Sequence, residues 1–388
     1  MTPLDRARLY ADELTAIRRD IHAHPELGLQ EHRTSDLVAR KLEEWGIEVH
    51  RNVGITGVVG VLRNGNGQAS VGLRADMDAL PIQELPGLPH ASQNPGLMHA
   101  CGHDGHTTML LGAAKYLSET RDFNGTVNFI FQPAEEGLGG AEAMLKDGLF
   151  QRFPCNAVYG LHTRPGLPVG HFATSKGARF AGGAFFDIKI TGQGAHGARP
   201  QQSIDPVIVA CHLGTALQTI VSRNISAQDT AVLSVTRIQS GDAYNVIPQY
   251  AYLAGTVRAM KAEVMALVEQ NMKRLATSIA EGFGATAEVD FRNLFAPVVN
   301  DEHEAEAYAD AAASVAGEAF LRRDDPPAMA SEDFGAMMQL VPGAHVLVGN
   351  GDSAAVHNHQ FDFNDEAIPY GVALLAAITE KKLPRGVQ

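Results

Sequence analysis

Four short apolar runs in this chain each lead into acidic or histidine side chains. They are residues 70–74 before Asp76 and Asp78, residues 125–132 before Glu135 and Glu136, residues 156–161 before His162, and residues 345–349 before His357. Branched and aromatic residues bounded by Gly and Pro predict β-strands. Because open α/β sheets place their sites beyond the carboxyl ends of the strands, these polar groups are expected to meet at one edge.

Helical patterns alternate with these runs between residue 1 and about residue 181. They cover residues 5–24, 33–45 (with Gly46 as a stop) and 106–117. Such alternation is typical of an α/β fold with a mostly parallel sheet and helices on both of its faces.

The order of elements changes between residues 183 and 292. It reads strand 184–191, helix 204–223, strands 230–239 and 251–258, helix 262–282 and strand 286–291. This order predicts an inserted α+β two-layer sandwich. We therefore expect one domain from residues 1–182 and 293–388 and a second from residues 183–292, with the pair Gly182 and Gly183 as the hinge.

Composition excludes several classes of protein. The 388 residues suggest two domains, and 45% hydrophobic with 19% charged residues is ordinary for a globular protein. No apolar stretch is long enough for a membrane span, and residues 1–13 do not resemble a signal peptide. A net charge of −13 argues against nucleic acid as a partner.

Cysteine usage indicates a reducing compartment, and we expect a cytoplasmic protein. The three cysteines, an odd number with scattered spacing, do not form a disulfide pattern. Cys155 and Cys211 lie in apolar patterns and are expected to be buried and inert.

Cys101 and His103 are separated by one glycine and lie just before a helical pattern. Taken alone, the two residues fit two interpretations equally well: a pair of metal ligands, or a buried thiol beside a helix-capping histidine. Two adjacent carboxylates such as Glu135 and Glu136 are usually a solvated pair, but this interpretation is weaker at the end of a buried strand. Together the four side chains predict metal ligands with a general base beside them, as a hydrolase needs to activate water against an amide.

Six segments in the same order resemble the hippurate hydrolase and indole-acetyl-amino-acid hydrolase family. They are residues 74–81, 98–104, 132–136, 160–162, 194–197 and 358–366. This family is the Cys-ligand branch of the aminoacylase and carboxypeptidase G superfamily. The resemblance extends from about residue 21 to Tyr370.

The resemblance implies a centre with two divalent ions per subunit, Mn²⁺ or Zn²⁺. Cys101 would bridge the ions, and the remaining ligands would be His103, His162, Glu136 and His357. Glu135 resembles the general base, and Asp78 resembles a group that holds a ligand imidazole. Where the family often has Pro, this chain has His359; His357 keeps the family offset to residues 362–365, so we expect it to be the ligand and His359 to be a pocket residue.

The inserted domain contributes His196, Asn245 and Arg258. From the residues alone, the histidine fits a plain loop and the asparagine fits a turn. The resemblance implies that both line the substrate site, that the histidine reaches the site of a partner subunit, and that Arg258 holds a substrate carboxylate. It also implies a homodimer formed through the inserted domain, which would serve as lid and dimerisation domain to the catalytic remainder.

The implied activity is a di-metal amidohydrolase that cleaves N-acyl amino acids into a carboxylic acid and an amino acid. A dipeptidase or aminopeptidase-like exopeptidase of the same superfamily is the alternative; it would need a carboxylate to hold the substrate ammonium, which the sequence does not locate. A metal-dependent binding module is a further alternative. It is disfavoured because binding requires Glu136 but not Glu135 beside it.

Overall fold

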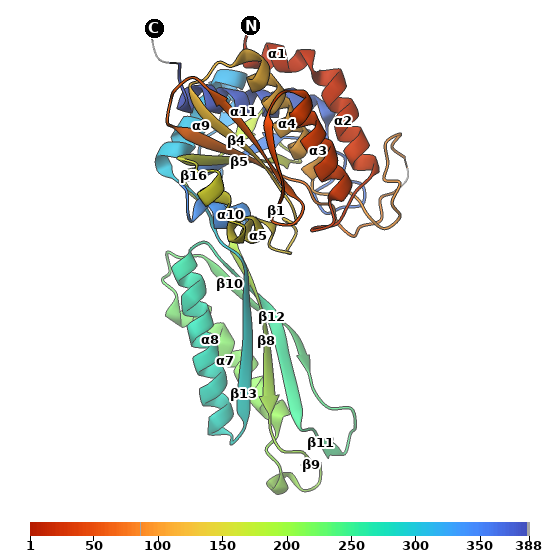
Figure 1. Ribbon diagram of the computed structural model, residues 1–388. Coiled ribbons are helices and arrows are strands. Elements are labelled where there is room, and N and C mark those ends of the chain that lie inside the picture. Colours follow the sequence, from red (N-terminus) through yellow and green to blue (C-terminus); the bar gives the residue numbers. More distant parts are fainter. Residues whose placement is uncertain (86, 386–388) are drawn as a thin grey trace. The chain divides into compact units, whose positions relative to one another are not determined.

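The computed structural model describes residues 1–85 and 87–385, which form two compact units (Figure 1). Unit 1 comprises Met1–Arg179, Val299–Pro327 and Asp333–Gln388, and unit 2 comprises Phe180–Val298 and Ala328–Glu332. The sequence places the domain boundaries at 182/183 and 292/293, and the catalytic and lid roles of the two domains stay predictions.

Unit 1 is built on an eight-stranded sheet in the order β1-β2-β4-β3-β5-β16-β6-β15. Its central strands β4, β3, β5 and β16 are parallel, whereas β1 and β2 pair antiparallel with their neighbours. The short strand β6 pairs antiparallel with β16 and parallel with β15. The predicted mostly parallel sheet is confirmed, and the antiparallel β1–β2 edge is an addition that the sequence reading did not include. The strands are β1 (Glu48–Val53), β2 (Gly57–Asn64), β3 (Ser70–Asp76), β4 (Gly125–Gln132), β5 (Ala157–Arg164), β6 (Phe172–Ala173), β15 (Leu321–Arg322) and β16 (Gly343–Gly349).

Helices cover both faces of this sheet, because successive strand side chains point to opposite sides. In β4, Phe129 and Phe131 join one buried cluster and Ile130 joins another. The first cluster packs under α1 (Pro3–Leu9), α2 (Ala11–Ala23), α3 (His32–Glu44), α4 (His103–Thr120), α9 (Glu302–Ala316) and α11 (Ile368–Lys382). The second packs under α5 (Gly140–Lys146), α6 (Leu149–Arg152) and α10 (Phe334–Met338).

Two predicted helices have different bounds in the structure. The helix expected at residues 5–24 is broken at Tyr10, whose N–H bonds to Ala7 O and ends α1. The helix expected from residue 106 begins at His103, because Gly102 takes a left-handed φ of 86° and its carbonyl accepts the first helical bonds. His103 therefore lies in the first turn of α4, where its side chain does not cap the helix.

Unit 2 is a two-layer sandwich, as predicted. Its antiparallel sheet has the order β10-β12-β8-β13, and α7 and α8 pack on one face (Figure 1). On the other face Phe185, Tyr250 and Tyr252 are each about two-fifths exposed. The bounds are β8 (Gly182–Thr191), α7 (Pro206–Thr219), β10 (Ala231–Gln239), β12 (Tyr250–Ala259), α8 (Ala262–Gly282) and β13 (Thr286–Phe295).

Short elements complete the chain. Two strand pairs are β7 (Gly177–Phe180) with β14 (Val298–Asn300) and β9 (Ala195–His196) with β11 (Val246–Ile247). The 3₁₀ turns are Pro200–Gln202, Glu318–Phe320 and Asp365–Ala367, and a π-helical turn covers Ile220–Asn224.

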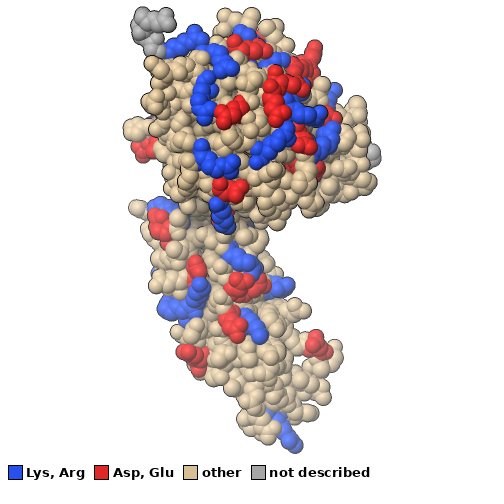
Figure 2. Space-filling model, in the orientation of Figure 1, with Lys and Arg blue, Asp and Glu red and all other residues tan. Residues whose placement is uncertain are grey.

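Surface features agree with the composition only in part. None of the helices described has both the length and the apolar character that crossing a membrane requires. Basic and acidic side chains are interspersed on the face shown in Figure 2.

The predicted burial of Cys211 is wrong: it is exposed, because Val209, Ala210 and Leu213 form the inward face of α7. Cys155 is partly buried.

Candidate metal centre

The predicted ligands of unit 1 meet beyond the carboxyl ends of its parallel strands. Cys101 belongs to two groups of candidate ligand residues. Within each group, all the ligand atoms lie within 4.8 Å of one another. The first group adds His103 and His162, and the second adds Glu136 and His357. Cys101 Sγ lies 3.4 Å from His162 Nε2. The thiol therefore occupies the position that joins two neighbouring sets of donors.

His103 is held from one side and open on the other. Its Nδ1 donates to Asp78 O at 2.9 Å and lies 3.2 Å from Asp78 Oδ1. Its Nε2 is buried and has no hydrogen-bond partner among the described residues. An unpaired buried nitrogen is costly, and metal-bound histidines use one ring nitrogen for the metal and the other for a carboxylate or carbonyl. The residues present therefore fit a divalent metal ion.

The second group combines a carboxylate with an exposed imidazole. His357 Nε2 lies 3.0 Å from Glu136 Oε1, and the Glu136 N–H donates to Asp78 Oδ2 at 3.0 Å. His357 has a left-handed φ of 63°, and its N–H bonds to Ala100 O at 2.7 Å. His359 belongs to none of the candidate ligand groups found among the described residues, so the geometry favours His357 of the two.

Electrostatics favour a thiolate at the centre. Burial opposes ionisation of Cys101, but the charges of His162 and His103 outweigh it and lower the pKa of the thiol to about 6. Burial lowers the pKa of His162, whereas the thiolate raises it to about 9. Hydrogen bonding to Cys101 and Glu136 raises the pKa of His357 to about 10. Without metal, protons on the imidazoles balance the anionic ligands, and divalent cations can take the place of those protons.

Glu135 lies beside the candidate ligands but is held separately. It is 6% exposed, and one of its oxygens lies within 4.8 Å of candidate atoms of His103 and Glu136. The N–H of Asp333 donates to Glu135 Oε1 at 3.3 Å. Ala134, just before it, has a left-handed φ of 52°, so the chain turns sharply after β4. This turn brings the two successive carboxylates to the same centre.

His106 and Asp76 support His162 in a way that the sequence reading missed. His106 Nδ1 donates to Asp76 Oδ1 at 2.7 Å, and its Nε2 accepts the Thr163 N–H at 2.8 Å. The carbonyl of Thr163 in turn accepts from His162 Nδ1 at 2.7 Å. Both ring nitrogens of His106 are therefore occupied, which makes it a support rather than a ligand.

A buried arginine network below the site was also missed. Arg74 donates to Gln132 at 2.8 Å, to Asp76 at 2.7 Å and to Asp333 at 3.1 Å. Gln132 Nε2 donates to Asp333 at 2.7 Å as well. The signal was present in the sequence, since an arginine and an aspartate two residues apart in a buried strand point to the same face and need partners there.

Within unit 2, the predicted site residues His196 and Asn245 lie far from the third, Arg258. Arg258 pairs with Gly183 at one end of β8, whereas β9, which carries His196, follows beyond Thr191 at the other end. From Gly183 to Thr191 the strand spans about 25 Å at its usual rise. His196 and Asn245 lie together, since the N–H of Gly197 bonds to Asn245 O at 2.8 Å. Within unit 2 these two cannot contact the same small molecule as Arg258.

His196 and Arg258 each have hydrogen-bond donors that could bind a polar group of a substrate. His196 Nδ1 accepts the Ala198 N–H at 3.0 Å, which leaves the ring proton on the exposed Nε2 as a donor. Arg258 is half-buried, and no ion pair joins it to a carboxylate among the described residues. Its Nη1 donates to Val257 O at 3.0 Å, and the other guanidinium N–H groups are available for an anionic group.

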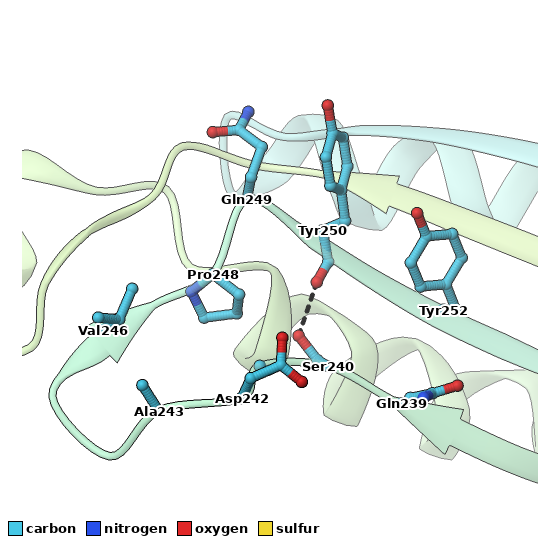
Figure 3. A pocket seen from close by; sticks show the side chains of 10 residues that line it. Gln239, Ser240, Asp242, Ala243, Val246, Pro248, Gln249, Tyr250 and Tyr252 are labelled. Carbon is cyan, nitrogen blue, oxygen red and sulfur yellow. Dashed lines mark hydrogen bonds between the residues drawn. The ribbon is translucent and has the colours of Figure 1, made fainter.

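A cavity of about 490 Å³ lies in unit 2, between the end of β10 and the start of β12 (Figure 3). Tyr250 and Tyr252 line one side, and Ser240 Oγ donates to Tyr250 O at 2.7 Å. None of its lining residues is a predicted site residue. The candidate chemistry therefore lies in the cluster of unit 1, which combines a thiolate, imidazoles and carboxylates as metal-dependent hydrolases do.

The chain belongs to peptidase family M20/M25/M40, whose model matches residues 72–381. It is 42% identical to the hippurate hydrolase of Campylobacter jejuni, over 96% of this chain and 97% of that protein. It is 39% identical to the N-acetylcysteine deacetylase of Bacillus subtilis, over 93% and 94%. The crystal structure of Bacillus subtilis YXEP, a dinuclear metal binding peptidase from the M20 family, matches with a TM-score of 0.85 and 35% identity, covering 97% of this chain and 99% of that chain. The protein is thus a hydrolase of amide bonds that depends on divalent metal.

Proposed function

We propose that this protein hydrolyses N-acyl amino acids to a carboxylic acid and a free amino acid. The observation that carries the proposal is Cys101, which joins two sets of ligand atoms with Glu135 beside them. The similarity to hippurate hydrolase and to N-acetylcysteine deacetylase supports this substrate class, since both names describe removal of an acyl group from an amino acid nitrogen.

The proposed centre holds two ions per subunit. Cys101, His103, His162, Glu136 and His357 would hold these ions, and Cys101 is the member common to both groups of candidate ligand atoms. Two bound ions would supply Lewis acidity towards the acyl carbonyl and lower the pKa of the attacking water. A thiolate ligand favours Zn²⁺, and the carboxylate allows Mn²⁺.

Glu135 moves the proton in this proposal. It accepts a proton from the attacking water as the oxygen adds to the acyl carbon, and it later delivers that proton to the leaving nitrogen as the C–N bond breaks. Asp78 holds the ring of His103 and the N–H of Glu136, so it orients ligands on both sides of the centre. The free carboxylate of the substrate is held by Arg258, whose planar guanidinium suits two parallel bonds.

We further propose a homodimer formed through unit 2. The open sheet face exposes Phe185, Tyr250 and Tyr252, and His196 lies at the end of the sheet opposite to Arg258. His196 of one copy would then donate from Nε2 to the oxyanion formed in the other copy, with Asn245 beside it. A cytoplasmic location is proposed because a thiolate ligand requires a reducing compartment.

A substrate panel with metal analysis tests the proposal. Protein purified without added metal is analysed for Mn and Zn and assayed with benzoyl-glycine, acetyl-methionine and Gly-Leu. Release of glycine or methionine, abolished by a chelator and restored by Mn²⁺ or Zn²⁺, is expected. Turnover of Gly-Leu alone would indicate a dipeptidase, and metal binding without turnover would indicate a binding module.

A further inference from the structure

Glu31 is a fully buried carboxylate that the proposed chemistry does not use. It stands directly before α3, at the position where side chains commonly cap a helix, yet it makes no capping bond. Glu26 supplies that cap instead, accepting the N–H groups of Arg33 and Thr34, each at 2.9 Å. The side chain of Glu31 is therefore not needed to cap α3.

Both oxygens of Glu31 accept buried hydrogen bonds, and one of these bonds comes from the segment that carries Glu135. Oε1 accepts the N–H of Ala134 at 2.8 Å, and Oε2 accepts the hydroxyl of Thr56 at 2.5 Å. Burial raises the pKa of Glu31, and the bond from Thr56 opposes that rise. A buried carboxylate is costly unless hydrogen bonds satisfy its oxygens, and these two bonds do so.

Those bonds fix a strained residue. Ala134 is fully buried and has a left-handed φ of 52°, which a residue with a Cβ rarely adopts. The next amides are held as well: Glu136 N–H donates to Asp78 Oδ2 at 3.0 Å, and Gly140 N–H donates to Ala134 O at 3.1 Å. Glu135 thus lies between two amides that two different buried carboxylates hold. Such strain persists only where the surroundings over-determine it.

We propose that Glu31 is a positioning residue for hydrolysis: by binding the amide of Ala134 it stabilises the strained turn that aims Glu135 at the reacting water. It acts through the backbone and does not touch the substrate. The proposal rests on the proposed role of Glu135. Because Asp78 holds the amide of Glu136 independently, loss of Glu31 should disturb the base more than the ligand.

The test compares Glu31→Leu, which removes the acceptor, with Glu31→Gln, whose amide oxygen still accepts one bond. We expect Glu31→Leu to lower kcat by about ten- to a hundredfold, as displacement of a catalytic group by about 1 Å can do. KM should stay within about twofold and the metal content should be unchanged. Glu31→Gln should retain most of the activity. Glu26→Leu is the matched control: it removes a helix cap, so it should lower Tm and leave kcat near wild type.

A second substitution reports on the strain itself. Glycine adopts a positive φ without penalty, so Ala134→Gly should restore kcat of the Glu31→Leu protein by roughly fivefold and change wild-type kcat little. If Glu31→Leu does not fold, Glu31→Asp decides, because its shorter carboxylate cannot reach both partners and kcat should fall about tenfold. Wild-type kcat in the variant that folds would overturn the proposal, as would a loss explained by lost metal.

Hydrogen exchange separates this proposal from the proposed function. Exchange of amides in residues 133–140, measured without substrate on metal-loaded protein, should be faster in Glu31→Leu than in wild type and unchanged in Glu26→Leu. Equal exchange in Glu31→Leu and wild type would overturn the role of Glu31. Failure of wild type to hydrolyse any N-acyl amino acid would overturn the proposed function instead.

Discussion

Complementation between two inactive variants tests whether His196 acts in the partner subunit. Glu135→Gln removes the proposed base of unit 1, and His196→Ala removes the proposed donor of unit 2. His196 lies about 25 Å or more along the sheet from Arg258, so the two cannot serve one substrate within a single unit 2. If Arg258 acts in its own subunit, His196 has to come from the second copy.

Subunit counting gives the size of the effect. In a mixed dimer one site combines both defects, and the other combines an intact Glu135 with an intact His196 from the partner. Each mixed dimer therefore has half of the wild-type sites. With equal amounts and free exchange about half of the dimers are mixed, so total activity should recover to about one quarter of wild type.

The assay follows hydrolysis of benzoyl-glycine after mixing, while native mass spectrometry of differently tagged copies follows exchange. The matched control mixes Glu135→Gln with Cys101→Ser. These residues lie in the same cluster of unit 1, so this mixture should stay inactive if each cluster is built from one chain. Full exchange without recovery in the first mixture would refute the reasoning and place His196 in its own subunit or outside catalysis.

Substitutions of Glu135, Cys101 and Arg258, with Cys155→Ser as a control, test the remaining roles. Glu135→Gln should lower kcat about a hundredfold or more and leave the metal content unchanged, because Glu136 is the proposed ligand; metal loss in this variant would exchange the two roles. Cys101→Ser should lose metal and activity, whereas Cys155→Ser should keep both; metal analysis that finds equal content in the two would remove Cys101 from the centre. Arg258→Lys should raise KM for free-acid substrates and change little for amide-capped ones; if wild type cleaves both kinds equally well, carboxylate recognition is wrong.

Strand patterns and motif spacing predicted the parts of this molecule that depend on local sequence. The strand at residues 125–132 and the helix at residues 262–282 match the structure to the residue, since each has a periodic apolar face and clear ends. The antiparallel β1–β2 edge was not predicted, because β1 is largely exposed and carries little apolar alternation. The break at Tyr10 follows from a single local bond inside an otherwise continuous helical pattern.

The supports of the candidate site were harder to predict than its ligands. The ligands follow motifs that are short in sequence, whereas Glu31 reaches Ala134 across more than a hundred residues. His106 was read only as part of a helix, since nothing local shows that its ring accepts from a strand amide in β5. That amide needs such an acceptor because the pairing of β3 with β5 ends at Gly160. Contacts of this kind depend on the assembled fold.

Left-handed backbone conformations link these long-range contacts to the chemistry. Gly102, Ala134 and His357 all have positive φ values, and each is, or directly adjoins, a proposed ligand or the proposed base. For residues other than glycine such a conformation costs about 1–3 kcal/mol. Two bonds offset this cost: the Ala134 N–H donates to Glu31 Oε1, and the His357 N–H donates to Ala100 O. These two bonds tie the segments that carry Glu135 and His357 to other parts of unit 1.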